Sequence, residues 1–169
     1  MFCVAFSPCG RWIAAGTGGR NIHIWDAKTG KNVAIMKPAH AYAIHTLAFT
    51  PDGNTLISGG GYSPKTANEP MLKVWDVATR SERFALGKDK GHTDDVYSVS
   101  VNKSGTNVAS ASEDGTVRIW DLKTGQQVGP ARQHQGIVWS VAFGPNCELA
   151  SASGYSRFGK VETWKPTLP

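Results

Sequence analysis

A tryptophan–aspartate pair recurs along the chain at an almost constant interval, and this repeat constrains the fold more than any other feature. The pair occurs at Trp25-Asp26, Trp75-Asp76 and Trp120-Asp121, and Trp164-Lys165 is a degenerate fourth copy. Successive copies are separated by 50, 45 and 44 residues. A period of this length is typical of stacked supersecondary units that bury their apolar faces against one another. The sequence therefore predicts four repeated units.

Two further landmarks recur in the same register. A short apolar segment that ends in proline is found at residues 4–8, 47–51 and 141–145, and Val99-Ser100-Val101 takes its place in the third unit. A histidine lies nine residues before the aromatic or valine landmark of three units, at His40, His92 and His134. Agreement among three independent features fixes the division of the chain. The expected units are residues 1–37, 38–88, 89–131 and 132–169.

The third unit shows most clearly how one repeat folds. Residues 96–101 alternate apolar and polar side chains, as a half-buried strand does. A second strand of small residues is expected at 108–112, and a third, rich in β formers, at 116–120. Glu113-Asp114-Gly115 is a tight-turn signal between them, and residues 126–128 are the expected outer strand. Each unit is thus predicted to be a four-stranded antiparallel sheet.

The segment from Gly91-His92 through Asp114-Gly115 to Trp120-Asp121 resembles the WD-repeat β-propeller family. The resemblance implies an all-β propeller of about four WD-type blades. Family members usually have about seven blades, so an open or incomplete ring is expected here. Three alternatives remain: a fragment of a larger propeller, a homodimer that completes one ring, or a small ring formed by one chain.

The resemblance also implies a buried hydrogen-bonded tetrad in the third unit, made of His92, Ser110, Asp114 and Trp120. The other units depart from this pattern. The second unit has the histidine, serine and tryptophan, but a long turn at residues 59–70 leaves no aligned aspartate. The fourth unit has an expanded turn at residues 154–159. The third unit is therefore expected to be the most rigid.

The candidate partner site lies four residues before the phenylalanine landmark of each unit. This position holds Phe2, His45, Tyr97 and Trp139, all of them ring-bearing. In the family the position faces the mouth of the central channel, and aromatic residues are common anchors of interfaces. With Glu113 beside the turn, these residues are predicted to bind a protein or peptide partner. The alternative is that the rings only pack between blades. The long turn at residues 59–70 is a second candidate.

The predicted function is a non-enzymatic scaffold for protein–protein interaction. A nucleic-acid-associated propeller is an alternative because the formal net charge is +5, but the basic residues are scattered. A hydrolase is a weaker alternative that rests on the residue types of His92, Ser110 and Asp114. Against it, His40 with Ser58 and His134 with Ser151 repeat the same pair, as a structural feature would.

No cofactor or metal is expected, because the five histidines and three cysteines show no ligand spacing. No apolar run approaches the roughly 18 residues that a membrane helix needs. The first residues lack the basic and apolar regions of a secretory signal. The expected location is therefore cytoplasmic, with the nucleus as the alternative.

Overall fold

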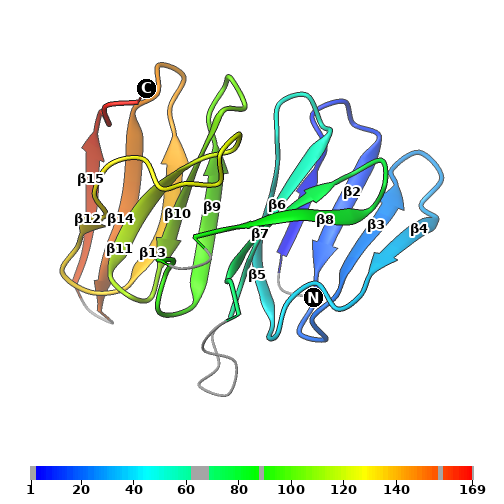
Figure 1. The fold of residues 1–169 in the computed structure, drawn as a ribbon, viewed down its shortest axis with the longest axis horizontal. Coiled ribbons are helices and arrows are strands. Elements are labelled where there is room, and N and C mark those ends of the chain that lie inside the picture. Colours follow the sequence, from blue (N-terminus) through cyan, green and yellow to red (C-terminus); the bar gives the residue numbers. More distant parts are fainter. Residues whose placement is uncertain (1–2, 62–68, 88–89, 156–157, 169) are drawn as a thin grey trace.

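The chain folds into four antiparallel β-sheets that follow one another in sequence order (Figure 1). The computed structural model describes residues 3–61, 69–87, 90–155 and 158–168, and these residues contain strands and turns but no helix. The first and fourth sheets lie at opposite ends of the arrangement, so the four sheets do not close into a ring (Figure 1). The fold is an all-β, open set of propeller blades, as the sequence predicts.

Each of the first three sheets has four strands in up-and-down order. The first sheet contains β1 (Cys3–Phe6), β2 (Trp12–Gly16), β3 (Ile22–Asp26) and β4 (Asn32–Met36). The second contains β5 (Ile44–Phe49), β6 (Thr55–Gly60), β7 (Leu72–Asp76) and β8 (Ser81–Leu86). The third contains β9 (Val96–Val101), β10 (Asn107–Ser112), β11 (Thr116–Asp121) and β12 (Arg132–Gln133). The fourth, of three strands, contains β13 (Val138–Phe143), β14 (Leu149–Tyr155) and β15 (Phe158–Trp164).

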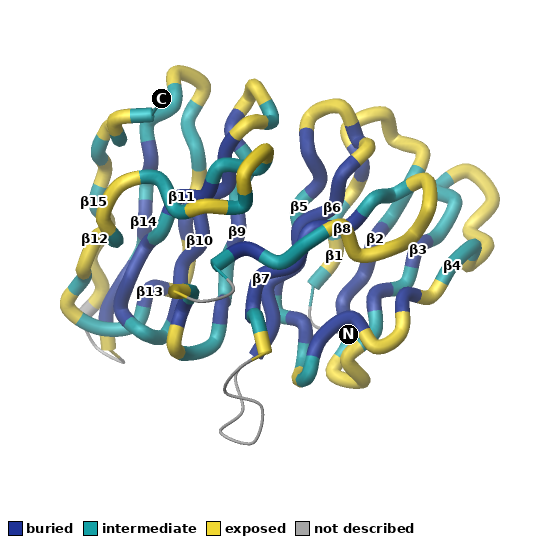
Figure 2. Tube along the Cα trace, in the orientation of Figure 1, coloured by how far each residue is buried: buried dark blue, intermediate teal, exposed yellow. Residues whose placement is uncertain are grey.

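The first strands of the sheets lie side by side and form the inner wall of the molecule. β1 contacts β5, β5 contacts β9, and β9 contacts β13. Three apolar clusters fill the spaces between successive sheets, centred on residues such as Leu56, Val108 and Leu149, none of which is exposed. Burial is concentrated in the second and third sheets, while the turns are exposed (Figure 2). The two middle sheets are buried on both faces because each has a neighbour on both sides.

Two glycines that the sequence places in a long turn belong instead to the buried strand β6. Gly59 pairs with Leu72 of β7, and Gly60 donates its N–H to the Met71 carbonyl at 2.8 Å. A Cβ on Gly59 would lie 2.5 Å from the Thr46 side chain, and one on Gly60 would lie 2.5 Å from the His40 ring. Glycine is therefore required here by close packing rather than by a loop. Of the expected turn at 59–70, residues 62–68 lie outside the described residues.

The expanded turn expected at residues 154–159 is also largely strand. β14 and β15 remain paired up to Gly154 with Gly159 and Tyr155 with Phe158. These pairs lengthen the hairpin, so the extra residues extend the sheet instead of looping out. Residues 156 and 157 lie outside the described residues.

The outer strand of the third sheet differs from the expected strand at residues 126–128. Gln127 makes only an isolated bridge with Trp120, and regular pairing resumes at β12, opposite Thr116 and Val117. The Gly129-Pro130 dipeptide explains the interruption, because Gly129 has a φ of 67° and proline has no N–H to donate. β12 also lies just beyond residue 131, where the third unit was expected to end.

Candidate partner-binding site

Three of the predicted site residues occupy equivalent irregular positions on neighbouring inner strands. The pairing of β5 with β6 skips His45, that of β9 with β10 skips Tyr97, and that of β13 with β14 skips Trp139. A β-bulge of this kind redirects a side chain out of the regular alternation of the strand. Phe2, the fourth predicted member, lies outside the described residues.

The three rings form a continuous row across three sheets, which we call the ring row (His45, Tyr97 and Trp139). The His45 and Tyr97 rings meet edge to face with centroids 5.5 Å apart. The Tyr97 and Trp139 rings stack at 5.0 Å with an interplanar angle of 20°. These distances and geometries are those of favourable aromatic pairs. The ring row therefore joins the second, third and fourth sheets and presents one connected aromatic surface.

Two carboxylates contact the polar atoms of the His45 and Tyr97 side chains. The Tyr97 hydroxyl donates a hydrogen bond to Glu113 Oε2, and the His45 ring nitrogen Nε2 lies 3.2 Å from Asp95 Oδ2. Burial raises the pKa of the Tyr97 hydroxyl, and the hydrogen bond to Glu113 and the nearby charges of Asp95 and Asp94 raise it further. The tyrosine is therefore neutral and fixed in orientation, and the surroundings of the ring row are acidic.

Part of the ring row is open to solvent. Trp139 is 50% exposed, although its indole N–H donates to the Gly154 carbonyl at 3.1 Å. His45 and Tyr97 are half-buried. An exposed ring that is held in place by a hydrogen bond and a stacking partner can contact a ligand with little further loss of side-chain entropy. The ring row thus has both an internal packing role and an accessible face.

The structure joins the four residues of the expected tetrad by hydrogen bonds. His92 Nδ1 lies 2.8 Å from Asp114 Oδ2, and His92 Nε2 lies 2.7 Å from the Ser110 hydroxyl. The Trp120 indole N–H donates to the same hydroxyl at 2.8 Å. The Asp114 carboxylate can only accept a hydrogen bond, so His92 Nδ1–H donates to it. His92 Nε2 then accepts from the Ser110 hydroxyl. The chain of bonds connects the turn before β11 to the middle of the sheet.

Electrostatics favour a neutral histidine and an ionised aspartate in this tetrad. Burial lowers the pKa of His92. Burial opposes ionisation of Asp114, but hydrogen bonds from His92, Thr116 and Thr93 outweigh it and hold the pKa of the carboxyl below its usual range. This Asp–His–Ser connectivity is that of a nucleophilic triad. Ser110, however, is 0% exposed and already accepts from an indole, so its hydroxyl cannot reach a substrate.

The second sheet holds a shorter version of the same arrangement. The Ser58 hydroxyl lies 2.6 Å from His40 Nε2 and accepts the Trp75 indole N–H at 2.8 Å. Burial lowers the pKa of His40 to about 3, and the positive charge of Lys73 contributes. This histidine is therefore neutral near neutral pH.

The fourth sheet uses a carboxylate that sequence reasoning missed. Glu162 lies opposite Ser151 in the pairing of β14 with β15. Its carboxylate contacts Lys160 Nζ at 2.6 Å and Arg132 at 2.9 Å, and it is 4.0 Å from His134 Nδ1. Hydrogen bonds from Lys160 and Arg132 lower the pKa of Glu162 to about 2. The corresponding residue of the third sheet is Arg118, opposite Ser110, so comparing these positions between units could have revealed the acid.

Among the described residues, no group of three or more His, Cys, Asp or Glu side chains could hold a metal ion. The thiols of Cys3, Cys9 and Cys147 are free. No helix in the described part of the chain is long and apolar enough to cross a membrane.

The amino-acid sequence is similar to those of several known proteins. The family model "WD domain, G-beta repeat" matches residues 1–26, 30–76 and 85–121, more than half of the chain. A pre-rRNA-processing protein crb3/ipi3 of Schizosaccharomyces pombe is 30% identical, over 74% of this chain and 29% of its own length. A DDB1- and CUL4-associated factor 11 homolog of Caenorhabditis briggsae is 29% identical, over 73% of this chain and 22% of its own length.

A solved structure shares the fold. The structure of U3-55K superposes with a TM-score of 0.83 at 21% identity, over 97% of this chain and 48% of that one. This chain therefore spans about half of that structure and less than a third of the two relatives named above. The repeats, the four sheets and the family match agree: the chain belongs to the WD-repeat family of β-propeller proteins.

Proposed function

We propose that this chain is a non-enzymatic scaffold that binds an extended peptide segment of a partner protein across the ring row. WD-repeat propellers are generally non-catalytic scaffolds. The observation that carries the proposal is the contact of three rings, each at a β-bulge of a different sheet, with Trp139 half exposed. Rigid aromatic residues at the centre of a surface are the usual anchors of interfaces.

The charge around the ring row indicates the chemistry of the peptide. Glu113, Asp95 and Asp94 all lie close enough to Tyr97 to raise its pKa. A cation over the face of Trp139 or Tyr97 would gain from the ring quadrupole as well as from these carboxylates. We therefore expect the bound peptide to carry a lysine or arginine.

The relatives support a partner protein rather than a small molecule. One of them is named for its association with DDB1 and CUL4, which are proteins. The other is named for pre-rRNA processing, which supports the nucleus as a location alongside the cytoplasm. Nucleic acid remains the alternative partner, and a binding constant that falls steeply with salt would favour it.

The open faces of the end sheets suggest that the ring is completed by other chain segments. Val4 and Phe6 of the first sheet are 62% and 63% exposed, and Val161 of the fourth is 73% exposed. Further blades of a longer protein or a second copy of this chain would cover these apolar side chains. The mass in solution shows whether the chain forms a homodimer or stays a monomer.

Selection from a peptide library tests the proposed site. Twelve-residue peptides displayed on phage would be selected on the wild-type chain, synthesised, and titrated by fluorescence anisotropy. Trp139→Ala and Glu113→Gln should each weaken binding at least tenfold, because they remove the exposed ring and the acceptor that orients Tyr97. Phe6→Ala is the matched control, since Phe6 is an exposed ring on an inner strand away from the ring row. Equal loss in the control and the site variants would refute the proposed site.

A further inference from the structure

A second surface, between the second and third sheets, has the opposite charge to the ring row. A pocket of about 630 Å³ lies between the end of β8 and the β11 hairpin. Three of its lining residues are cationic: Lys90, Arg118 and Lys123. No carboxylate is among the described residues that line it. The neighbouring cleft differs, because Asp52 and Asp121 accompany its cations there.

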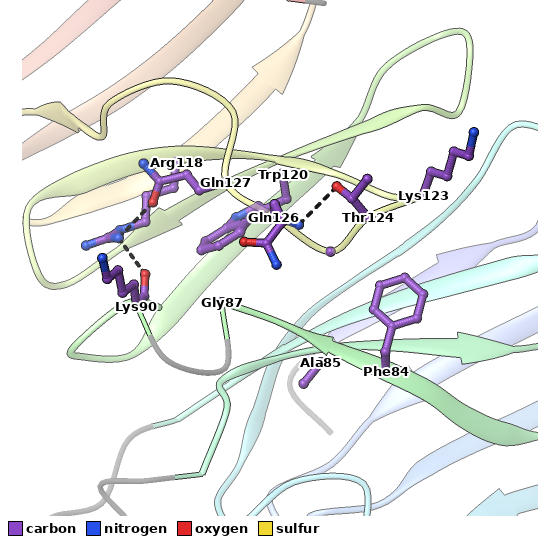
Figure 3. Close-up of a pocket in the computed structure, with 11 residues that line it drawn as sticks. Phe84, Ala85, Gly87, Lys90, Arg118, Trp120, Lys123, Thr124, Gln126 and Gln127 are labelled. Atoms are coloured by element: carbon purple, nitrogen blue, oxygen red, sulfur yellow. Dashed lines mark hydrogen bonds between the residues drawn. The ribbon is translucent and has the colours of Figure 1, made fainter.

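The arrangement of side chains gives the pocket two distinct ends. Figure 3 shows Arg118, Lys90 and Gln127 together at one end, and Phe84 and Lys123 toward the other, with Trp120 between them. One end of the cavity therefore holds two cations, and the other combines the apolar Phe84 ring with a single cation.

Hydrogen bonds fix the orientation of the Arg118 guanidinium at one end of the pocket. Its Nη1 donates to the Lys90 carbonyl and to Gln127 Oε1, each at 2.9 Å. Its Nε lies 3.4 Å from the Thr116 hydroxyl. Among the described residues Nη2 makes no hydrogen bond, so the guanidinium is fixed in place with donors to spare. Because both Nη1 hydrogens are already donated, a two-pronged contact with phosphate oxygens uses Nη2 together with Nε, whose contact with Thr116 is the longest of the three. Fixing the guanidinium beforehand lowers the entropy cost of binding.

The apolar wall fits a peptide better than a nucleic-acid base. The Trp120 ring is 0% exposed and lies against Gly87, where an added Cβ would come within 2.5 Å of the ring. The half-buried Phe84 ring lies near Gly125, where an added Cβ would come within 3.5 Å of it. The Trp120 ring therefore offers no free face for base stacking, and the Phe84 ring is only partly exposed.

The outer edge of β8 gives a peptide a second means of binding. β8 is the edge strand of its sheet, and within the described residues no strand pairs with its outer side. Ala85 of β8 and Gly87, which directly follows the strand, line the pocket. An extended segment could therefore add hydrogen bonds to the strand edge while its side chains enter the pocket.

We propose that this pocket binds a phosphorylated segment of a partner protein, with the phosphate at Arg118 and Lys90 and the peptide passing over Phe84 toward Lys123. A phosphate monoester carries about −1.5 to −2 charges at neutral pH, which is complementary to the cations that line this end of the pocket. The proposal is independent of the ring row, which lies on the inner strands and has acidic surroundings.

The test compares a phosphorylated and an unphosphorylated form of one probe. The probe is a fluorescein-labelled nonapeptide of alanine and valine with a central serine or phosphoserine, titrated by anisotropy at fixed ionic strength. The phosphoserine form should bind at least tenfold more tightly than the serine form. Arg118→Lys keeps the charge but loses the two-pronged geometry, and Lys90→Gln removes a charge. Each should weaken binding of the phosphoserine peptide at least fivefold.

Lys28→Gln is the matched control. Lys28-Thr29-Gly30 is the counterpart in the first sheet of the Lys123-Thr124-Gly125 turn, and it is outside the pocket. Lys28→Gln and Glu113→Gln should leave binding of this probe unchanged. Glu113→Gln alters the ring row and not this pocket, so it distinguishes loss of binding at the pocket from loss of binding at the ring row.

Three results would overturn the proposal. Equal binding of the two peptides would show that the phosphate is not recognised. Equal loss in Lys28→Gln and Lys90→Gln would show only general attraction to a chain of net charge +5. Displacement by equimolar inorganic phosphate, or tighter binding of a fifteen-residue oligothymidylate, would assign the site to a free anion or to nucleic acid.

Discussion

The third and fourth sheets hold the same histidine in two different ways. In the third, His92 lies within a chain of short hydrogen bonds that runs from Asp114 through Ser110 to Trp120. In the fourth, His134 lies 3.4 Å from Ser151, and its acidic neighbour Glu162 also binds the exposed Lys160.

The difference shows how repeats that share a sequence pattern can differ in rigidity. A connected, largely buried network fixes a sheet because each missing bond leaves a buried polar group without a partner. A partly exposed ion-pair cluster can exchange its bonds with water at little cost. We therefore predict that the third sheet is the most stable part of the molecule, and the variants below test that difference.

The largest effect is expected on removing the acid of each network. Asp114→Ala leaves the buried donors of His92 and Thr116 unpaired and should lower the free energy of unfolding by about 3 kcal/mol. Glu162→Ala should cost less, and its cost should shrink further in 1 M salt because its partners are exposed. Urea denaturation at two salt concentrations measures both. A larger loss in Glu162→Ala than in Asp114→Ala would reverse the comparison.

A smaller effect is expected on removing the central hydroxyl. Ser110→Ala leaves His92 Nε2 and the Trp120 indole N–H without a partner and should cost about 2 kcal/mol. Ser151→Ala removes only a 3.4 Å contact to His134 and should cost less than about 1 kcal/mol. Thermal and urea denaturation of the pair give the answer, and equal losses would mean that the two networks are equally tight.

A loss of stability that grows gradually as the pH falls is expected in the second sheet. The pKa of His40 is lowered from 6.5 to about 3, so the unfolded chain takes up a proton there before the folded chain does. The stabilisation is complete above pH 6.5 and is lost as pH falls toward 3, at about 1.4 kcal/mol per pH unit. His40→Asn should flatten the slope of stability between pH 6.5 and 5. Ser58→Ala is the control: it should lower stability but keep the slope, because the buried imidazole remains.

Much of this fold follows from local sequence periodicity. The repeat predicted the four sheets, and the position four residues before the phenylalanine landmark selected His45, Tyr97 and Trp139, which the structure brings into contact. The three rings come into contact because equivalent positions carry the same β-bulge in the second, third and fourth sheets. A feature that recurs in successive units is visible in the order of residues alone.

The features that could not be predicted from the sequence depend on contacts between residues that are distant along the chain. Gly59 and Gly60 resembled a loop, but the close approach of Thr46 and His40 places them in a strand. Glu162 became a candidate only when pairing placed it opposite Ser151 and next to Arg132. The pocket at Arg118 arises between two sheets, from side chains that are distant in sequence.

The most direct test of the proposed function is to observe the tryptophan side chains themselves. The chain has six tryptophans, and their indole N–H groups give separate signals in a nitrogen–proton correlation spectrum. Adding a selected peptide should shift the signal of Trp139, while Trp75 and Trp120, buried and bonded to serines, should stay in place. An unchanged Trp139 signal in the presence of saturating peptide would contradict the assignment of the partner site to the ring row.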